Sequence, residues 1–161
     1  MIPFMQININ DFEKTKELGE KLYKETAEVY CPYFKEKVSF THHGLNHLKF
    51  KKIDKLRPIQ DQYMRFKLLH LAFVVVRSSN TLQGFLETKK FERIRIHSRN
   101  DVILKPVKYY EFLAVIDRNR IKIILKQIDN GTIFFWSIIP FWGMDKDTMT
   151  RIFHEGSPEE D

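Results

Sequence analysis

Apolar residues recur at helical spacing in the N-terminal part of the chain. After Asp11, a candidate N-cap, the residues Leu18, Leu22 and Val29 fall on one face of a helix, and charged residues occupy most other positions. Pro32 is expected to end this helix, because proline removes a backbone hydrogen bond and clashes with the preceding turn. The pattern therefore predicts an amphipathic helix between Asp11 and Pro32.

A short strand at residues 38–41 and a histidine-rich bend at 42–47 are predicted next, followed by a longer helix with Pro58 in its first turn. The side chains expected on the buried face of this helix are spaced by three or four positions and are Ile59, Tyr63, Phe66, His70 and Phe73. His70 is thus expected in the core. The three valines at 74–76 favour extended structure, so the helix could end before them.

The C-terminal third predicts three antiparallel strands. They are apolar segments of similar length and cover residues 108–117, 120–128 and 132–140. Asp117–Arg120 is expected to form the first turn and Asp129–Gly131 the second, since Asn and Gly tolerate positive φ. Pro140 is expected to end the third strand. Both faces of these strands are apolar, so helices should cover at least one of them.

Residues 79–106 give the weakest pattern. Residues 91–97 alternate and fit a strand or one arm of a hairpin, while Arg99–Asp101 and Lys105–Pro106 are expected to form turns. Together with the helices and the final strands, the order of elements predicts an α+β fold. In that fold the N-terminal helices pack on a C-terminal antiparallel β-meander.

Charge is unevenly distributed along the chain, which has a formal net charge of +6. Residues 35–108 hold 17 Lys and Arg against 6 Asp and Glu, whereas residues 145–161 hold six acids and two bases. A basic region of this size indicates a polyanionic partner such as RNA. We expect one domain over residues 1–144 and an acidic tail over 145–161. The tail either stays solvated or folds back over the basic surface, and we expect the solvated arrangement.

The cysteine count and the hydropathy exclude several classes of protein. The single cysteine, Cys31, excludes a disulfide framework and a cysteine-based zinc cluster. No stretch reaches the roughly 18 consecutive apolar residues of a membrane span. The N-terminal residues also lack the basic region of a signal peptide. We therefore expect a cytoplasmic protein with no membrane partner and no cofactor.

Three of the six histidines lie within residues 42–47, and a metal site is one interpretation of this cluster. His43 and His47 have the i, i+4 spacing that places two imidazoles on one face of a helix. Zinc proteases with this spacing carry a glutamate between the histidines, whereas this chain has Gly44, Leu45 and Asn46 there. A third ligand would have to come from His42, His70, His97 or His154, and the adjacent lysines would repel a dication. No metal site is predicted.

Acid and base chemistry on RNA is the second interpretation. RNA carries its own nucleophile, the 2′-OH, so cleavage needs a base, an acid and cations for the developing negative charge. The candidate catalytic residues are two histidines, two cations and a hydroxyl, namely His43, His47, Arg65, Lys126 and Ser137. The candidate RNA-binding residues are further cations and an aromatic ring that could stack on a base, namely Lys49, Lys51, Lys52, Arg57, Lys122 and Trp136.

Each of these residues also has an ordinary structural explanation. A basic segment commonly forms a solvated face, and a single histidine is more often structural than catalytic. Lys122 and Lys126 share one strand face with Ile124, which fits a partly solvated face. Ser137 lies in a very apolar strand and could simply bond to the backbone. It has no G-x-S-x-G motif around it, so a serine hydrolase is not expected.

The order of these parts resembles the superfamily that groups barnase, EndoU, colicin-type transfer-RNA nucleases and RelE toxins, called BECR below. The resemblance rests on FTHHGLNHL at residues 40–48, a long helix with an arginine, and FFWSIIP at residues 134–140, and it covers residues 36–140. It implies helices followed by an antiparallel sheet and RNA cleavage without metal. The family roles would fall on an early histidine, a helix-borne cation, a strand cation and a late hydroxyl: His47, Arg57 or Arg65, Lys126 and Ser137.

Three functional hypotheses follow. The first is a metal-independent endoribonuclease of the phage- or toxin-associated branch, cleaving RNA through its 2′-OH. For this branch the resemblance also implies a cognate antitoxin or immunity protein as partner. The second is a non-catalytic nucleic-acid-binding protein that uses the same basic surface. The third is a protein-interaction module.

Overall fold

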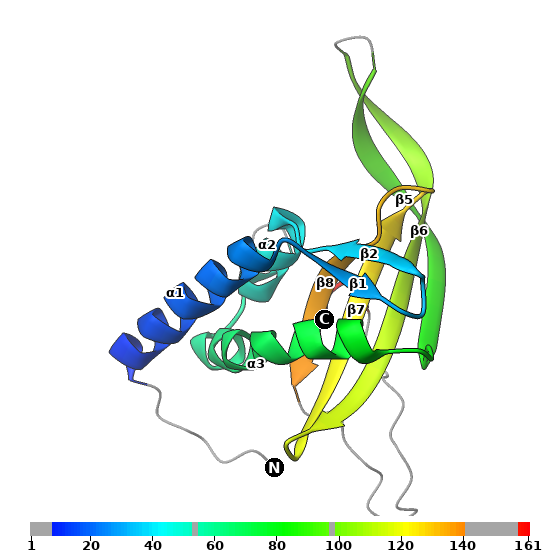
Figure 1. Ribbon diagram of the computed structural model, residues 1–161. Coiled ribbons are helices and arrows are strands. Elements are labelled where there is room, and N and C mark those ends of the chain that lie inside the picture. The colour runs from blue at the N-terminus through cyan, green and yellow to red at the C-terminus, as the bar shows by residue number, and fades with distance from the viewer. Residues whose placement is uncertain (1–7, 53–54, 97–98, 141–157) are drawn as a thin grey trace, which may run out of the picture.

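The computed structural model describes residues 8–52, 55–96, 99–140 and 158–161, which form three helices and eight strands. Six strands make one sheet in the order β1-β2-β8-β7-β6-β5, and the helices lie beside it (Figure 1). The α+β class, with N-terminal helices packed on a C-terminal meander, is confirmed. The elements are α1 (Ile9–Thr26), β1 (Glu28–Cys31), β2 (Glu36–Ser39), α2 (His42–Lys49), β3 (Phe50–Lys52), β4 (Lys55–Leu56), α3 (Ile59–Ser78), β5 (Gly84–Ile96), β6 (Arg99–Ile116), β7 (Asn119–Ile128) and β8 (Phe134–Pro140).

Helix α1 begins and ends earlier than the sequence pattern predicts. Its N-cap is Asn8, whose side chain accepts a hydrogen bond from the Asn10 N–H at 2.9 Å, so Asp11 lies in the first turn instead. The helix ends at Ala27, which has a φ of 58°. The chain then enters β1, which pairs antiparallel with β2. The prediction that the helix continues to Pro32 is wrong, because residues 28–31 pair with β2 in a hairpin closed by the turn at residues 32–35, and this pairing competes with the helical pattern.

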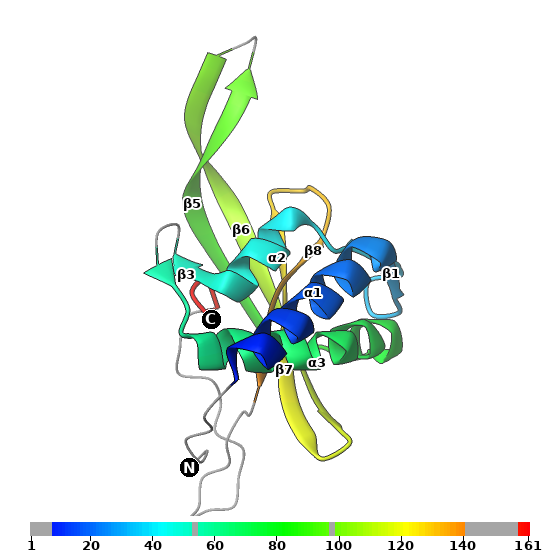
Figure 2. The same ribbon diagram turned by 90° about the vertical axis from the view of Figure 1, so that its left-hand side faces the viewer.

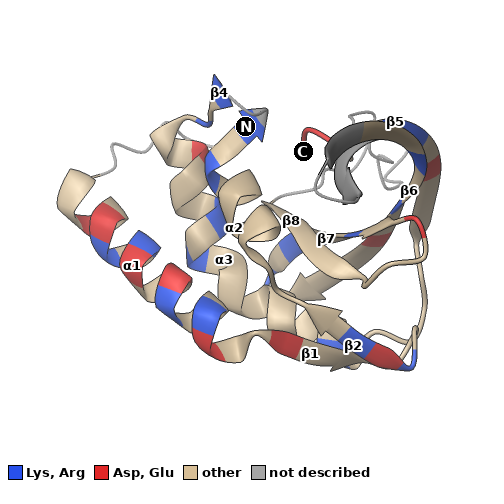
Figure 3. Cartoon of the chain, turned by 90° about the horizontal axis from the view of Figure 1, so that it is seen from above, with Lys and Arg blue, Asp and Glu red and all other residues tan. Residues whose placement is uncertain are grey.

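The buried face of α1 is also not the predicted one. Leu18 is 65 % exposed, whereas Phe12, Gly19 and Tyr23 are buried. At Gly19 a Cβ atom would lie 3.0 Å from the Phe66 ring, so the glycine allows α1 to approach α3 closely. Acidic and basic positions are mixed along the rest of α1 (Figure 3).

Helix α3 continues through all three valines, so the alternative of a strand there is wrong. Pro58 is its N-cap rather than a residue of its first turn. The helix is apolar around most of its circumference and is therefore buried on several sides. His70 lies on its exposed side, with Nδ1 3.1 Å from the Lys67 carbonyl, so the predicted core position is wrong. An all-round apolar helix gives no clear period from which the exposed side could be read.

Strands β5 and β6 form a long hairpin that extends beyond the rest of the sheet (Figures 1 and 2). Their register runs from Gly84 opposite Glu111 to Ile96 opposite Arg99. The predicted turns at Arg99–Asp101 and Lys105–Pro106 are wrong, because both segments lie within β6. Proline is tolerated at position 106 because the pairing of β6 with β7 begins only at the next residue, Val107, opposite Ile128.

Strands β6, β7 and β8 form the predicted antiparallel meander, with Asp117, Arg118 and Asp129 at positive φ in its turns. The main hydrophobic core fills the space between this sheet and the helices. Strand β8 pairs with β2 in parallel only at Phe134, opposite Ser39. Beyond that pair α2 and α3, rather than β2, pack along the outer edge of β8. The candidate site lies along this edge.

Candidate functional site

Residues His42–Lys49 form the short helix α2 rather than a bend. Leu45 and Leu48 are buried beneath it. Gly44 faces β8 so closely that a Cβ atom there would collide with the Phe135 carbonyl oxygen and lie 2.7 Å from the Tyr23 hydroxyl. The glycine therefore lets α2 rest directly on β8, which brings His47 onto the sheet.

His47 is enclosed by an aromatic ring and a cation. The side chain is 5 % exposed, and its ring stacks on the indole of Trp136 with 4.0 Å between centroids and 17° between planes. Its Nε2 lies 3.1 Å from an Nη of Arg57. The Nε of the same arginine donates to the His47 carbonyl at 2.9 Å. The imidazole is thus fixed in both position and rotation.

A β-bulge in β8 explains why Trp136 and Ser137 reach this site. Ser137 pairs with Ile124 and Phe135 pairs with Leu125, so Trp136 is an extra residue in β8. Bulges re-aim side chains and are common beside active sites. The Lys126 ammonium lies 4.1 Å from the centroid of the Trp136 ring, a cation–π distance.

Two arginines approach from the start of α3 and are held by a shared carboxylate. Asp61 accepts from the Arg65 Nε at 2.7 Å and pairs with Arg57 at 3.4 Å, each at a spacing of four residues. Arg57 and Arg65 are only 4 % and 5 % exposed. One carboxylate therefore offsets part of the repulsion between two buried guanidinium groups.

Ser137 connects Arg65 to the sheet. Its hydroxyl accepts a hydrogen bond from an Nη of Arg65 at 2.7 Å and is fully buried. The same nitrogen donates to the Ile138 carbonyl at 3.1 Å, on the edge of β8 that β2 leaves open. Ser137 therefore bonds to a cation rather than only to the backbone.

The segment Pro158–Asp161, which holds three acidic residues, folds back into this cluster. Arg57 donates to the main-chain oxygens of Glu160 at 2.8 Å and Asp161 at 3.1 Å. The Asp161 oxygen also accepts from Arg65 and, at 2.6 Å, from the Ser137 hydroxyl. The expectation of a solvated tail is wrong for these four residues. The rest of the predicted tail, 145–157, lies outside the described residues.

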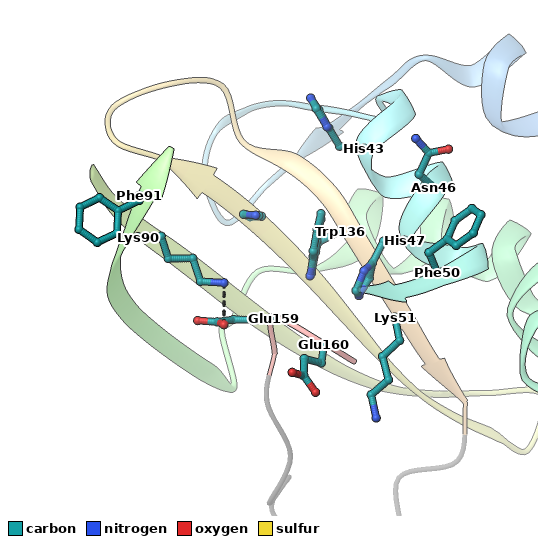
Figure 4. A pocket seen from close by; sticks show the side chains of 11 residues that line it. His43, Asn46, His47, Phe50, Lys51, Lys90, Phe91, Trp136, Glu159 and Glu160 are labelled. Carbon is teal, nitrogen blue, oxygen red and sulfur yellow. Dashed lines mark ion pairs between the residues drawn. The ribbon is translucent and has the colours of Figure 1, made fainter. Parts of the chain in front are cut away.

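An open pocket of about 710 Å³ adjoins this cluster, between α2 and the β5–β6 hairpin (Figure 4). Its volume falls within the roughly 300–1,000 Å³ of small-molecule sites. Lys90 of the hairpin pairs with Glu159 across it at 2.6 Å. The lining residues are His43, Asn46, His47, Phe50, Lys51, Lys90, Phe91, Lys126, Trp136, Glu159 and Glu160.

The surroundings of His47 keep its imidazole neutral. Burial lowers the pKa of His47 to about 2, and the charges of Arg57, Arg65 and Lys126 act in the same direction. A backbone hydrogen bond with Asp161 partly opposes this shift. In this arrangement His47 is neutral near neutral pH, so it has no proton to donate and is a weak base.

The neighbouring cations keep their charge or sit in ion pairs. Burial lowers the pKa of Arg57 to about 10, with a further contribution from Arg65, so Arg57 stays protonated near neutral pH. Lys122 is buried on β7 and pairs with Glu111 at 3.8 Å. Burial lowers the pKa of Lys122, while Glu111 and Asp161 counteract the shift.

The structure brings together most of the predicted site residues. The residues that meet in the cluster or line the pocket are His43, His47, Lys51, Arg57, Arg65, Lys126, Trp136 and Ser137. Lys49 points elsewhere and pairs with Glu20 of α1 at 2.7 Å. Lys122 does not line the pocket, and the side chain of Lys52 lies outside the description.

Sequence reasoning missed Asp61 and Lys90, and for the acidic segment it favoured the solvated alternative over the folded-back one. Asp61 had a readable signal, because it lies four residues from an arginine on either side and such pairs meet on a helix. No sequence signal pointed to Lys90, because its position beside the site depends on the path of the β5–β6 hairpin.

A guanidinium occupies the position that a metal ligated by Nε2 of His47 would need, since this nitrogen faces Arg57. Among the residues that the structure describes, no three His, Cys, Asp or Glu side chains are grouped so as to hold a metal ion. In the same ranges no helix is long and apolar enough to span a bilayer.

Comparison with known proteins gives no match to a family model, to a curated protein or to a solved structure.

Proposed function

We propose that this chain is a metal-independent endoribonuclease that cleaves RNA by attack of the 2′-OH on the adjacent phosphate. One observation carries the proposal. Donors from Arg57, Arg65 and Ser137 converge on a single oxygen, that of Asp161, beside the neutral imidazole of His47. Cations and a hydroxyl that surround one oxygen suit the non-bridging oxygens of a phosphate.

The roles follow from what transesterification requires. His47 takes the proton of the 2′-OH, and that oxygen forms a bond to phosphorus. Arg57, Arg65 and Ser137 then hold the negative charge of the phosphorane. The bond from phosphorus to the 5′ oxygen breaks, and His43, which lines the same pocket, gives that oxygen a proton. Atoms and protons balance without a metal or cofactor.

Trp136 and Lys126 support this arrangement. The indole stacks on the imidazole and fixes its rotation, so the base is oriented before substrate arrives. The Lys126 ammonium lines the pocket and adds positive charge near the scissile phosphate. A sequence-based role of Trp136 in stacking a base stays a prediction, since its ring contacts His47 and Lys126 in this structure.

The neighbouring pocket offers room for the nucleoside next to the scissile phosphate. Phe50 and Phe91 supply aromatic surfaces, and Asn46 supplies an amide for a base edge. Lys51 and Lys90 provide cations for flanking phosphates, so affinity should fall with rising salt. The proposed substrate class is accordingly single-stranded RNA, whose bases are splayed and accessible.

The resemblance to the BECR superfamily supports the same reaction and suggests a toxin or phage-defence role. A cognate antitoxin or immunity protein belongs to that part of the proposal. The biological role and the partner are inferred from the resemblance alone, whereas the proposed reaction is also supported by the geometry of the site.

The test is cleavage of transfer, messenger and ribosomal RNA in the presence of EDTA, with analysis of the ends. We expect 2′,3′-cyclic phosphate and 5′-hydroxyl ends. The variants His47→Ala and Arg65→Ala should each lower the rate by about 10²- to 10³-fold. His70→Ala is the matched control, because it removes an exposed imidazole on the far part of α3.

Intact RNA with the full chain and with a chain ending at Ser157 would refute the proposal. Loss of cleavage in EDTA, or equal rates for wild type and His47→Ala, would also refute it. RNA that is bound tightly but never cut would favour the non-catalytic nucleic-acid-binding protein instead.

A further inference from the structure

We infer that Pro158–Asp161 is a peptide ligand bound in cis to the oxyanion site of Arg57, Arg65 and Ser137, and that it excludes nucleic acid until it leaves. The inference rests on the proposed nucleic-acid role of this site. It assigns the site a second class of ligand, an acidic peptide, and gives the segment an inhibitory function.

The segment occupies the site mainly through its main-chain oxygens. The Pro158 carbonyl accepts from the Trp136 indole at 3.0 Å, and the Glu160 oxygen accepts from Arg57 at 2.8 Å. The Asp161 oxygen accepts from both arginines and the serine. Every named donor is one that the proposed reaction assigns to the phosphate or to the orientation of the base. Segment and phosphate therefore cannot occupy the site together.

Charge complementarity favours the same arrangement. The segment carries Glu159, Glu160 and Asp161, and it lies against buried cations. The carboxylate of Glu159 reaches across the pocket to Lys90 at 2.6 Å (Figure 4). Both glutamates line the pocket proposed for the nucleoside. The segment thus covers the phosphate site and part of the adjacent pocket.

The covered state also weakens the proposed base. Burial is the largest cause of the lowered pKa of His47. Departure of the segment would expose the imidazole to water, and a phosphate in its place would add an anion beside it. Both changes raise the pKa of His47, whereas loss of the backbone hydrogen bond with Asp161 lowers it. Because burial is the largest cause of the lowered pKa, the net direction is upward, towards a better base.

The segment should be displaceable. Ordering four residues costs conformational entropy that offsets much of the gain from these partly buried hydrogen bonds. A competing polyanion binds the molecules in which the segment has left. Its apparent affinity is therefore its intrinsic affinity multiplied by the fraction of such molecules.

The test measures binding of a short single-stranded DNA by fluorescence anisotropy. DNA lacks the 2′-OH, so the probe reports binding with no cleavage. A chain ending at Ser157 should bind at least about tenfold more tightly than the full chain. The control Glu159→Gln/Glu160→Gln/Asp161→Asn removes three charges but keeps every main-chain acceptor, and it should recover only a small part of this gain.

If the truncated chain and the control with three neutralised side chains bind the DNA equally tightly, net charge alone explains the gain in affinity. That result would overturn the inference. Unchanged or weaker binding by the truncated chain would overturn it as well. As a second measurement, the Trp136 indole N–H resonance of the full chain should shift when the DNA is added, and an unmoved resonance in a DNA-saturated chain would contradict displacement. Tighter DNA binding without RNA cleavage would refute the ribonuclease and leave this inference intact.

Discussion

The buried imidazole of His47 makes the stability of the folded chain depend on pH. In the folded state the pKa of His47 is lowered to about 2, whereas an unfolded chain carries a histidine of ordinary pKa, about 6.5. Above that value neither state binds the proton. As the pH falls below it, the unfolded chain takes up a proton that the folded chain refuses, so unfolding is favoured.

The magnitude follows from the two pKa values. Between about pH 8 and pH 5, proton uptake by the unfolded chain lowers the free energy of unfolding by about 2 kcal/mol for this one residue. His47 is 5 % exposed, so solvent screening reduces the effect little. Other groups titrate in the same range, and a variant is needed to isolate this contribution.

The assay is denaturant unfolding at both pH values for wild type and for His47→Gln. We expect the stability of wild type to fall by about 2 kcal/mol more than that of the variant over this interval. His70→Gln removes an exposed imidazole and should keep the wild-type difference. Identical pH dependence in wild type and His47→Gln would refute the reasoning. So would an NMR titration in which His47 of the folded full chain protonates near its ordinary pKa.

Three further perturbations test other parts of the structure. Gly44→Ala should lower stability by about 1–3 kcal/mol in thermal unfolding, because the added methyl collides with the Phe135 carbonyl and lifts α2 from β8. Lys126→Met should raise the pKa of His47 in an NMR titration, because one of the cations that disfavour the imidazolium is lost. Ser137→Ala should cost about 1–3 kcal/mol in denaturant unfolding, since Arg65 loses one of its buried acceptors and the Asp161 oxygen loses one of its donors.

Local signals in the sequence were sufficient for the meander. Asp129–Gly131 marks one turn, and the apolar runs on either side of it pair as β7 and β8. The start of α1 was misplaced because Asn8 and Asp11 are both good caps, and the sequence does not say which is used. Its end was misplaced because residues 28–31 form a hairpin with β2 across the turn at 32–35, whereas the spacing of Leu18, Leu22 and Val29 indicated a continuing helix.

The candidate site was predictable as a set of residue types but not as an arrangement. His47 and Arg57 are ten positions apart, so a basic, histidine-rich segment already suggests their proximity. Arg65 and Ser137 are separated by 72 positions, and their contact depends on a bulge in β8 that the sequence does not announce. The acidic segment was read as solvated because charge runs usually are, and its docking depends on main-chain oxygens that carry no sequence signal.

The measurement that tests the proposed reaction most directly uses a DNA strand with a single ribonucleotide, incubated in EDTA with the chain ending at Ser157. Attack by one 2′-OH at the site of His47, Arg65 and Ser137 predicts one cut, on the 3′ side of the ribonucleotide, with a 2′,3′-cyclic phosphate end, and no cut by His47→Ala. A strand that stays whole, or one that is also cut between deoxynucleotides, would contradict the account.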